Sequence, residues 1–158
     1  MDKNKTNVMR ILEREGISYR SHSYDPSDGK IDGEAVAHKL SQPVDQVFKT
    51  LVTTGSDKNH YVFVIPVAKE LDLKAAARTV GTKSIEMLKV SELLATTGYI
   101  RGGCSPIGMK KSFTTVVDES CLCQPSIYVS AGKIGRQVEL SPEDLIRIAG
   151  ASVAAICR

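Results

Sequence analysis

Thr-Gly-Tyr-Ile-Arg-Gly-Gly-Cys-Ser-Pro-Ile-Gly-Met-Lys-Lys, residues 97 to 111, holds four of the twelve glycines of the chain. The stretch has neither a helical nor a strand period, which predicts a shaped loop with a short extended lead-in at Tyr99–Arg101. Adjacent glycines at Gly102 and Gly103 permit positive φ angles and a close approach of another molecule to the main chain. Backbone N–H groups fixed in such a loop suit an anion or a developing oxyanion. A tight connection between two strands is the alternative that stays open.

Outward from this loop, hydrophobic periodicity and turn residues predict short helices and strands in mixed order. The predicted helices are one capped by Thr6 and ended by Gly16, Gly33–Leu40 capped by Asp32, Leu71–Val80, Val90–Thr97 capped near Ser91, and one from Ser141-Pro142 to about Ala149. The predicted strands are Ile17–Tyr24, Val47–Thr54, His60–Pro66, Ser84–Met87, Thr114–Asp118, Ser126–Ser130 and Gln137–Leu140. Residues 151–157 form a short apolar segment that fits either a strand or a helix.

The order of these elements predicts the fold class. Strands and helices do not alternate strictly, and the strands at 47–54 and 60–66 flank a five-residue turn that suits an antiparallel hairpin. We therefore predict an α+β fold with a curved, mixed but largely antiparallel, barrel-like sheet and flanking helices.

Length and composition limit the class of protein further. The chain has 158 residues, 42% hydrophobic and 25% charged, which predicts one domain over residues 1–158. Its net charge of +3 does not by itself indicate a nucleic-acid partner. No apolar run approaches the roughly 20 residues of a membrane span, and the N-terminus lacks the apolar core of a signal peptide. We therefore expect a cytoplasmic protein without a membrane partner.

Four cysteines, at positions 104, 121, 123 and 157, match no zinc-finger or ribbon spacing, and the chain has no C-x-x-C motif. The three histidines are scattered along the chain. We expect reduced, partly buried cysteines, no metal site and no cofactor. A redox or metal role for the pair Cys121 and Cys123 is retained as an alternative.

Lys49 stands out because it is the one charge in an apolar, β-branched strand. Alternation along the strand places Lys49 on the same face as Val47 and Leu51. One interpretation is an edge-strand lysine whose amine reaches solvent along its apolar stem. The other is a lysine that lines a cleft, where it would bind phosphate or polarise an ester carbonyl.

Ser130 ends a predicted strand beside a second glycine turn, at residues 131–135. Its hydroxyl would orient a substrate or bond the local backbone. Basic residues lie near both glycine turns, so the turns would form a positive rim suited to a phosphodiester backbone if they meet in space. These residues are Arg101, Lys110, Lys111, Lys133 and Arg136.

Three stretches, in this order and spacing, resemble the YbaK/EbsC family of aminoacyl-tRNA deacylases, which are related to the editing domain of prolyl-tRNA synthetase. They are Val47-Phe48-Lys49-Thr50-Leu51, the loop from Gly98 to Gly108, and Ile127-Tyr128-Val129-Ser130-Ala131-Gly132-Lys133. The resemblance covers nearly the whole chain and is greatest to the branch that hydrolyses Cys-tRNA(Pro). It implies a single domain that cleaves the ester of mischarged tRNA(Pro) at its acceptor end. It also implies prolyl-tRNA synthetase as a partner, and no DNA.

The resemblance also implies roles for individual residues. The catalytic set is Lys49, Gly102, Gly103 and Ser130, without a metal or a cofactor. The implied substrate-binding residues are Tyr24, Arg101, Ser105, Pro106, Gly108 and Lys133. Three positions in and after the second glycine turn depart from the family pattern, where Ala131 replaces a glycine, Ile134 an arginine and Gln137 an aspartate.

The implied chemistry is substrate-assisted, in which the thiol of the cysteinyl group attacks its own carbonyl and forms a cyclic thioester. Such a reaction needs no protein nucleophile, and Cys104 is not assigned as one. Two alternatives remain at this point: hydrolysis of Ala-tRNA(Pro) by an activated water, and a module that binds tRNA or a synthetase without catalysis.

Overall fold

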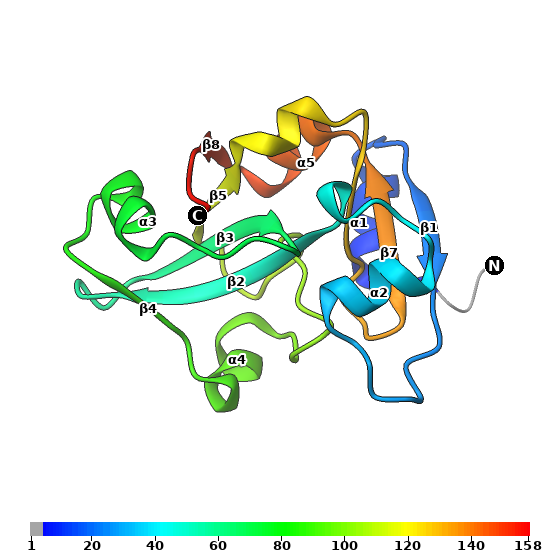
Figure 1. The fold of residues 1–158 in the computed structure, drawn as a ribbon, viewed down its shortest axis with the longest axis horizontal. Coiled ribbons are helices and arrows are strands. Elements are labelled where there is room, and N and C mark those ends of the chain that lie inside the picture. The colour runs from blue at the N-terminus through cyan, green and yellow to red at the C-terminus, as the bar shows by residue number, and fades with distance from the viewer. Residues whose placement is uncertain (1–4) are drawn as a thin grey trace.

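The computed structural model describes residues 5–158 (Figure 1). Residues 1–4, which open the N-terminal stretch before the first predicted helix, lie outside the described residues. The helices are α1 (Asn7–Arg14), α2 (Gly33–Lys39), α3 (Leu73–Val80), α4 (Val90–Thr97) and α5 (Pro142–Ala149), with 3-10 turns at Val44–Gln46 and Glu119–Cys123. The strands are β1 (Arg20–Ser23), β2 (Phe48–Gly55), β3 (His60–Pro66), β4 (Ile85–Met87), β5 (Thr114–Asp118), β6 (Ile127–Ser130), β7 (Arg136–Leu140) and β8 (Ser152–Ala154). No helix within residues 5–158 has the length and apolar character that crossing a membrane requires.

Side-chain caps fix where most helices begin. The Asp32 carboxylate accepts a hydrogen bond from the Ala35 N–H at 3.0 Å, which confirms the predicted start of α2. Asp72 caps α3 in the same way, so this helix begins at Leu73 rather than at Leu71. The predicted cap of α4 is wrong, because Lys89 occupies the N-cap position without a side-chain bond and Ser91 already lies within the helix.

The strands form two sheets rather than one barrel-like sheet. A five-stranded sheet has the order β4-β2-β3-β5-β8, and its β2–β3 pair is the predicted antiparallel hairpin. The strands β5 and β8 are added in parallel, which makes this sheet mixed. A smaller antiparallel sheet has the order β1-β7-β6 and lies at the end of the molecule opposite α3 and β4 (Figure 1). The predicted α+β class with mixed, largely antiparallel strands is confirmed, whereas the strands of residues 5–158 do not close into a barrel.

Both faces of the five-stranded sheet are buried. Along β3, Val62 and Val64 belong to a core cluster shared with α1, α5 and the small sheet, whereas Phe63 and Ile65 belong to a second cluster with α3. Because both faces are buried, the β2–β3 hairpin is rigid and holds the side chains at its edge in fixed positions.

The glycine loop, residues 97–111, connects α4 to β5 and therefore does not join two strands. Its two ends are tied together, because the Lys110 N–H donates to the Thr97 carbonyl at 3.0 Å. The Tyr99 hydroxyl crosses the loop and donates to the Ile107 carbonyl at 2.5 Å. Residues 99–101, the predicted extended lead-in, form no strand pair among the described residues. The loop is thus a closed, internally braced structure.

Candidate active site

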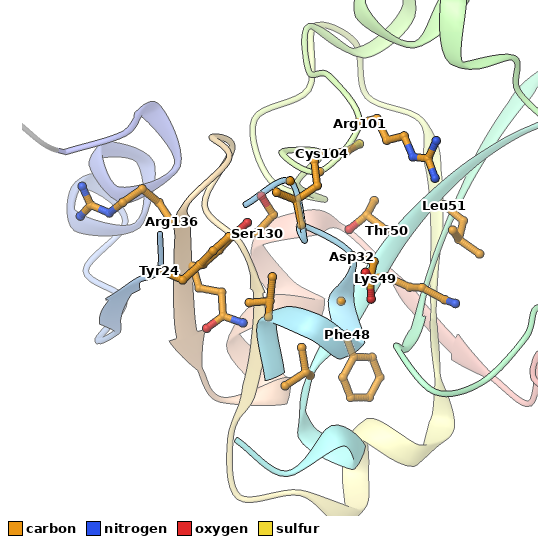
Figure 2. A pocket seen from close by; sticks show the side chains of 17 residues that line it. Tyr24, Asp32, Phe48, Lys49, Thr50, Leu51, Arg101, Cys104, Ser130 and Arg136 are labelled. Atoms are coloured by element: carbon orange, nitrogen blue, oxygen red, sulfur yellow. The ribbon is translucent and has the colours of Figure 1, made fainter. Parts of the chain in front are cut away.

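A cavity of about 630 Å³ lies where the outer edge of β2 meets the glycine loop and the small sheet (Figure 2). Segments far apart in the chain contribute its walls, which is the arrangement expected of a ligand site. The lining residues are Tyr24, Gly29, Ile31, Asp32, Gly33, Val36, Val47, Phe48, Lys49, Thr50, Leu51, Arg101, Gly102, Cys104, Ser130, Arg136 and Gln137.

The edge of β2 is open beside this cavity. On that side β4 pairs only with Thr53–Gly55, and a single bridge joins Val47 to Tyr128. The opposite edge of β2 pairs with β3, where Lys49 lies opposite Ile65. The strand is therefore fixed in the sheet while its edge beside the cavity stays accessible.

Lys49 lies half-buried in the cavity wall, which the sequence had left as one of two interpretations. Its ammonium group donates to the Val67 carbonyl at 3.3 Å and forms no salt bridge with any of the described residues. A cation that lines a cavity without a carboxylate partner is suited to a phosphate or to a carbonyl oxygen.

Gly102 faces the cavity, whereas Gly103 supports the loop. Gly102 has a φ of 86°, and a Cβ atom there would meet Ile31 at 2.7 Å. Gly103 already donates its N–H to the Ile100 carbonyl at 3.0 Å, so the expectation that both N–H groups face a ligand is wrong for Gly103. Within residues 5–158 the Gly102 N–H donates to no protein acceptor.

The two glycine turns touch at Gly103. A Cβ atom added to this buried residue would lie 3.0 Å from the Ile134 nitrogen and 3.3 Å from the Lys133 backbone. The condition for a shared basic rim is therefore met, since the turn that carries Arg101 packs against the turn that carries Lys133.

Ser105, Pro106 and Gly108 shape the glycine loop from inside and do not line the cavity. Ser105 is fully buried, and its hydroxyl accepts a hydrogen bond from the Ile107 N–H at 3.3 Å. Gly108 has a φ of 77° and leaves only 2.9 Å between its added Cβ and the side chain of Ile11. Lys133 is exposed and also lies outside the cavity lining.

Cys104 lines the cavity as a neutral thiol. Burial raises its pKa to about 12, so the nucleophilic thiolate is scarce at neutral pH. This agrees with the expectation that Cys104 is not the nucleophile.

Ser130, Tyr24 and Arg101 all reach the cavity. The Ser130 hydroxyl accepts a hydrogen bond from the Gly132 N–H at 3.1 Å, so it has both of the roles that the sequence allowed: a local backbone contact and a place in the wall. Tyr24 is half-buried and has the Lys39 ammonium 5.7 Å from its ring centroid.

Sequence reasoning missed several residues of the cavity. Thr50 adjoins Lys49, and its hydroxyl is buried without a hydrogen-bond partner. Gln137, noted only as a departure from the family, is buried and accepts from the Gln42 amide at 2.9 Å. Asp32 was predicted as a helix cap alone. The sequence around Thr50, Gln137 and Asp32 does not indicate that these residues line the same cavity.

Cys121, Cys123 and Cys157 are not among the residues that line this cavity. Cys121 is fully buried in the core, where burial raises its pKa to about 11, and Cys123 is exposed. No cluster of three or more His, Cys, Asp or Glu side chains suited to a metal ion occurs within residues 5–158.

Comparison with known proteins assigns the chain to a family. The model of the aminoacyl-tRNA editing domain matches residues 30–148. A protein of Enterococcus faecalis (strain ATCC 700802 / V583), described as "Putative Cys-tRNA(Pro)/Cys-tRNA(Cys) deacylase EbsC", is 45% identical over 152 residues, which are 96% of this chain and 93% of that protein.

Two solved structures share the fold. One, described as "a putative trans-editing enzyme for prolyl tRNA synthetase", has a TM-score of 0.85 at 24% identity, covering 100% of this chain and 99% of that one. The other, "hypothetical protein APE2540", has a TM-score of 0.88 at 24% identity, covering 97% and 100%. The match to the editing-domain model and the 45% identity to EbsC agree with the YbaK/EbsC resemblance, and the chain belongs to the aminoacyl-tRNA editing domain family.

Proposed function

We propose that this protein is a hydrolase that removes cysteine from mischarged Cys-tRNA(Pro), and that residues 1–158 act as one catalytic domain in the cytoplasm. The observation that carries the proposal is the meeting of Lys49, Gly102 and Ser130, from three separate segments, in one open cavity. The Enterococcus relative, described as a deacylase of Cys-tRNA, supports the choice of substrate.

The cavity fits ester cleavage by positioning. An aminoacyl ester is already activated, so the site has to orient it and stabilise the charge that develops on the carbonyl oxygen. In this proposal the Gly102 N–H donates to that oxygen, and Lys49 binds the terminal phosphate or ribose. Ser130 and Tyr24 hold the terminal adenosine region.

The substrate supplies the nucleophile in this scheme. Its thiol loses a proton and forms a carbon–sulfur bond to its own carbonyl carbon. The carbon–oxygen bond to the ribose then breaks, and the ribose oxygen takes up a proton as it leaves. Water opens the cyclic thioester afterwards. The raised pKa of Cys104 is consistent with a reaction in which no protein thiol takes part.

Binding to tRNA is proposed to use the basic rim around the two glycine turns, with prolyl-tRNA synthetase as the partner that selects tRNA(Pro). Arg101, Lys110, Lys111 and Lys133 are all exposed and free to contact phosphates.

The deciding experiment compares hydrolysis of Cys-tRNA(Pro), Ala-tRNA(Pro) and Pro-tRNA(Pro) by the purified protein. We expect fast loss of the cysteinyl ester and background rates for the other two. Faster loss of the alanyl ester would instead assign an activated-water deacylase. Binding of tRNA with background hydrolysis of all three would assign a module without catalysis.

A further inference from the structure

The charges around the cavity are unequal. Lys49 and Arg101 are cations among its lining residues, and Asp32 is the single carboxylate. Arg136 also lines the cavity, but its guanidinium group points away from it toward Met9 of α1 (Figure 2). A site with this balance attracts phosphate, and it leaves one position where a cation of the substrate would be favoured.

Asp32 has no cationic side chain as a partner within residues 5–158. One carboxylate oxygen accepts from the Ala35 N–H as the cap of α2, at 3.0 Å. No salt bridge to Asp32 is formed within residues 5–158, although the cations Lys49 and Arg101 also line the cavity. The carboxylate is exposed, so a ligand in the cavity can reach its second oxygen.

The remaining polar groups of the wall are less suited to hold a cation. The carbonyl oxygen of the Gln137 side chain is already used by Gln42. Glu139 lies outside the lining and is bound to His22 at 2.9 Å and to Ser126 at 2.6 Å. Asp32 is therefore the available full negative charge.

We propose that Asp32 binds the protonated α-amino group of the aminoacyl ester, an inference that rests on the proposed function. The substrate carries phosphate at one end and an ammonium group at the other, and the cavity lining offers the cations of Lys49 and Arg101 to the first and the Asp32 carboxylate to the second. With its ammonium held at Asp32 and its phosphate end at Lys49, the ester is oriented between two fixed charges.

The test compares two substrates that differ only in the amine: Cys-tRNA(Pro) and 3-mercaptopropionyl-tRNA(Pro), which keeps the thiol and the ester. The wild-type protein should prefer the amine-bearing ester by about tenfold in kcat/KM, the lower range for a charge-assisted hydrogen bond. In Asp32→Asn the helix cap is retained and the charge is lost, so this preference should fall to near one, mainly through KM for Cys-tRNA(Pro).

Asp72→Asn is the matched control, since Asp72 caps α3 with the same bond, from the Ala75 N–H at 3.1 Å, and lies outside the cavity. It should keep the wild-type preference. Asp32→Ser, a second capping residue, serves if Asp32→Asn does not fold. A folded Asp32 variant that keeps the wild-type preference overturns the assignment. If the wild-type protein hydrolyses neither ester, the proposed function fails, and this inference fails with it; hydrolysis of both at equal rates overturns the role of Asp32 alone.

Discussion

Strand β2 and the glycine loop both line the cavity, and they contribute to it in different ways. In β2 the main chain of Lys49 is paired with Ile65, and the side chain reaches the cavity. In the glycine loop the side chains of Ser105 and Ile107 are buried, and the main chain at Gly102 faces the cavity. Substitution of Lys49 in the strand should therefore change turnover first, whereas substitutions in the buried part of the loop should change stability first.

The largest effect should come from the strand. Lys49→Ala removes a cation from the wall, and the absence of each charge-assisted bond to the substrate should cost about 1.5–3 kcal/mol, or roughly 10- to 100-fold in rate. Single-turnover hydrolysis of Cys-tRNA(Pro) measures this decrease, and circular dichroism reports the fold. The long stem of Lys49 is only half-buried, so the fold should persist.

Two further variants serve as controls for Lys49→Ala. Lys49→Arg should restore only part of the rate, because a planar fork replaces a compact ammonium group. Lys69→Ala removes an exposed lysine just beyond β3, outside the cavity lining, and should leave the rate unchanged. Wild-type turnover in folded Lys49→Ala would make this residue an ordinary edge-strand lysine.

The glycine loop should show the opposite order of effects. In Gly103→Ala the new Cβ would press on the backbone at Ile134, 3.0 Å away, and overpacking of this kind costs about 1–3 kcal/mol. We expect a lower urea midpoint, with turnover falling because the loop is displaced. If Gly103 instead approached the substrate, as the sequence allows for the glycine pair, turnover would fall with little loss of stability.

Gly150→Ala is a useful reference for the Gly103 experiment, since it also places a side chain on a glycine but meets nothing within 4 Å. It should show only the strain of its φ of 60° and keep full activity at matched stability. If Gly103→Ala reduced turnover without any loss of stability, the direct-contact interpretation would be restored.

Local sequence was sufficient where local chemistry decides the structure. Asp32 and Ser141 predicted helix starts that the structure confirms, because their side chains bond the third backbone N–H that follows. The hairpin of β2 and β3 was also predicted, since turn residues separate two apolar runs. The start of α4 was not, because Lys89 lies at the N-cap without a side-chain bond.

Long-range pairing was beyond reach of the sequence. Nothing near Ser152–Ala154 indicates that this segment adds in parallel to β5, or that the strands divide into two sheets. The same limit applies to the cavity, where Lys49 was singled out by its own odd position. Thr50 and Asp32 became candidates only when the fold brought their segments together.

A smaller effect is expected from the part of the glycine loop that lies outside the cavity. Lys110 and Lys111 are exposed, so replacing both by alanine should weaken tRNA binding several-fold without changing the single-turnover rate at saturation. Removal of one lysine–phosphate interaction should reduce the slope of log K against log salt by about 0.7–0.9. An affinity that does not change with salt in the wild-type protein would argue against the basic rim.

The smallest effect on deacylation should come from Cys104→Ser. This variant tests whether a side chain of the glycine loop takes part in the reaction, because Cys104 belongs to the loop and lines the cavity. Burial raises the pKa of this thiol to about 12, so it is protonated throughout the range in which the enzyme would work. We expect nearly unchanged deacylation from about pH 6 to 9, and the same for the buried Cys121→Ser wherever that variant remains folded.

The raised thiol pKa should instead affect the free energy of unfolding at high pH. A thiol that keeps its proton to about pH 12 when folded, but releases it near about pH 8.5 when unfolded, stabilises the folded state fully below that lower value. This stabilisation declines as the pH rises from there toward 12, and Cys104→Ser should make the decline less steep in urea titrations. Loss of deacylation in a folded Cys104→Ser protein, with no change in that decline, would mean that the loop contributes a reactive side chain. The loop would then supply a reacting group to the cavity, in addition to the main chain of Gly102 and the cation of Arg101.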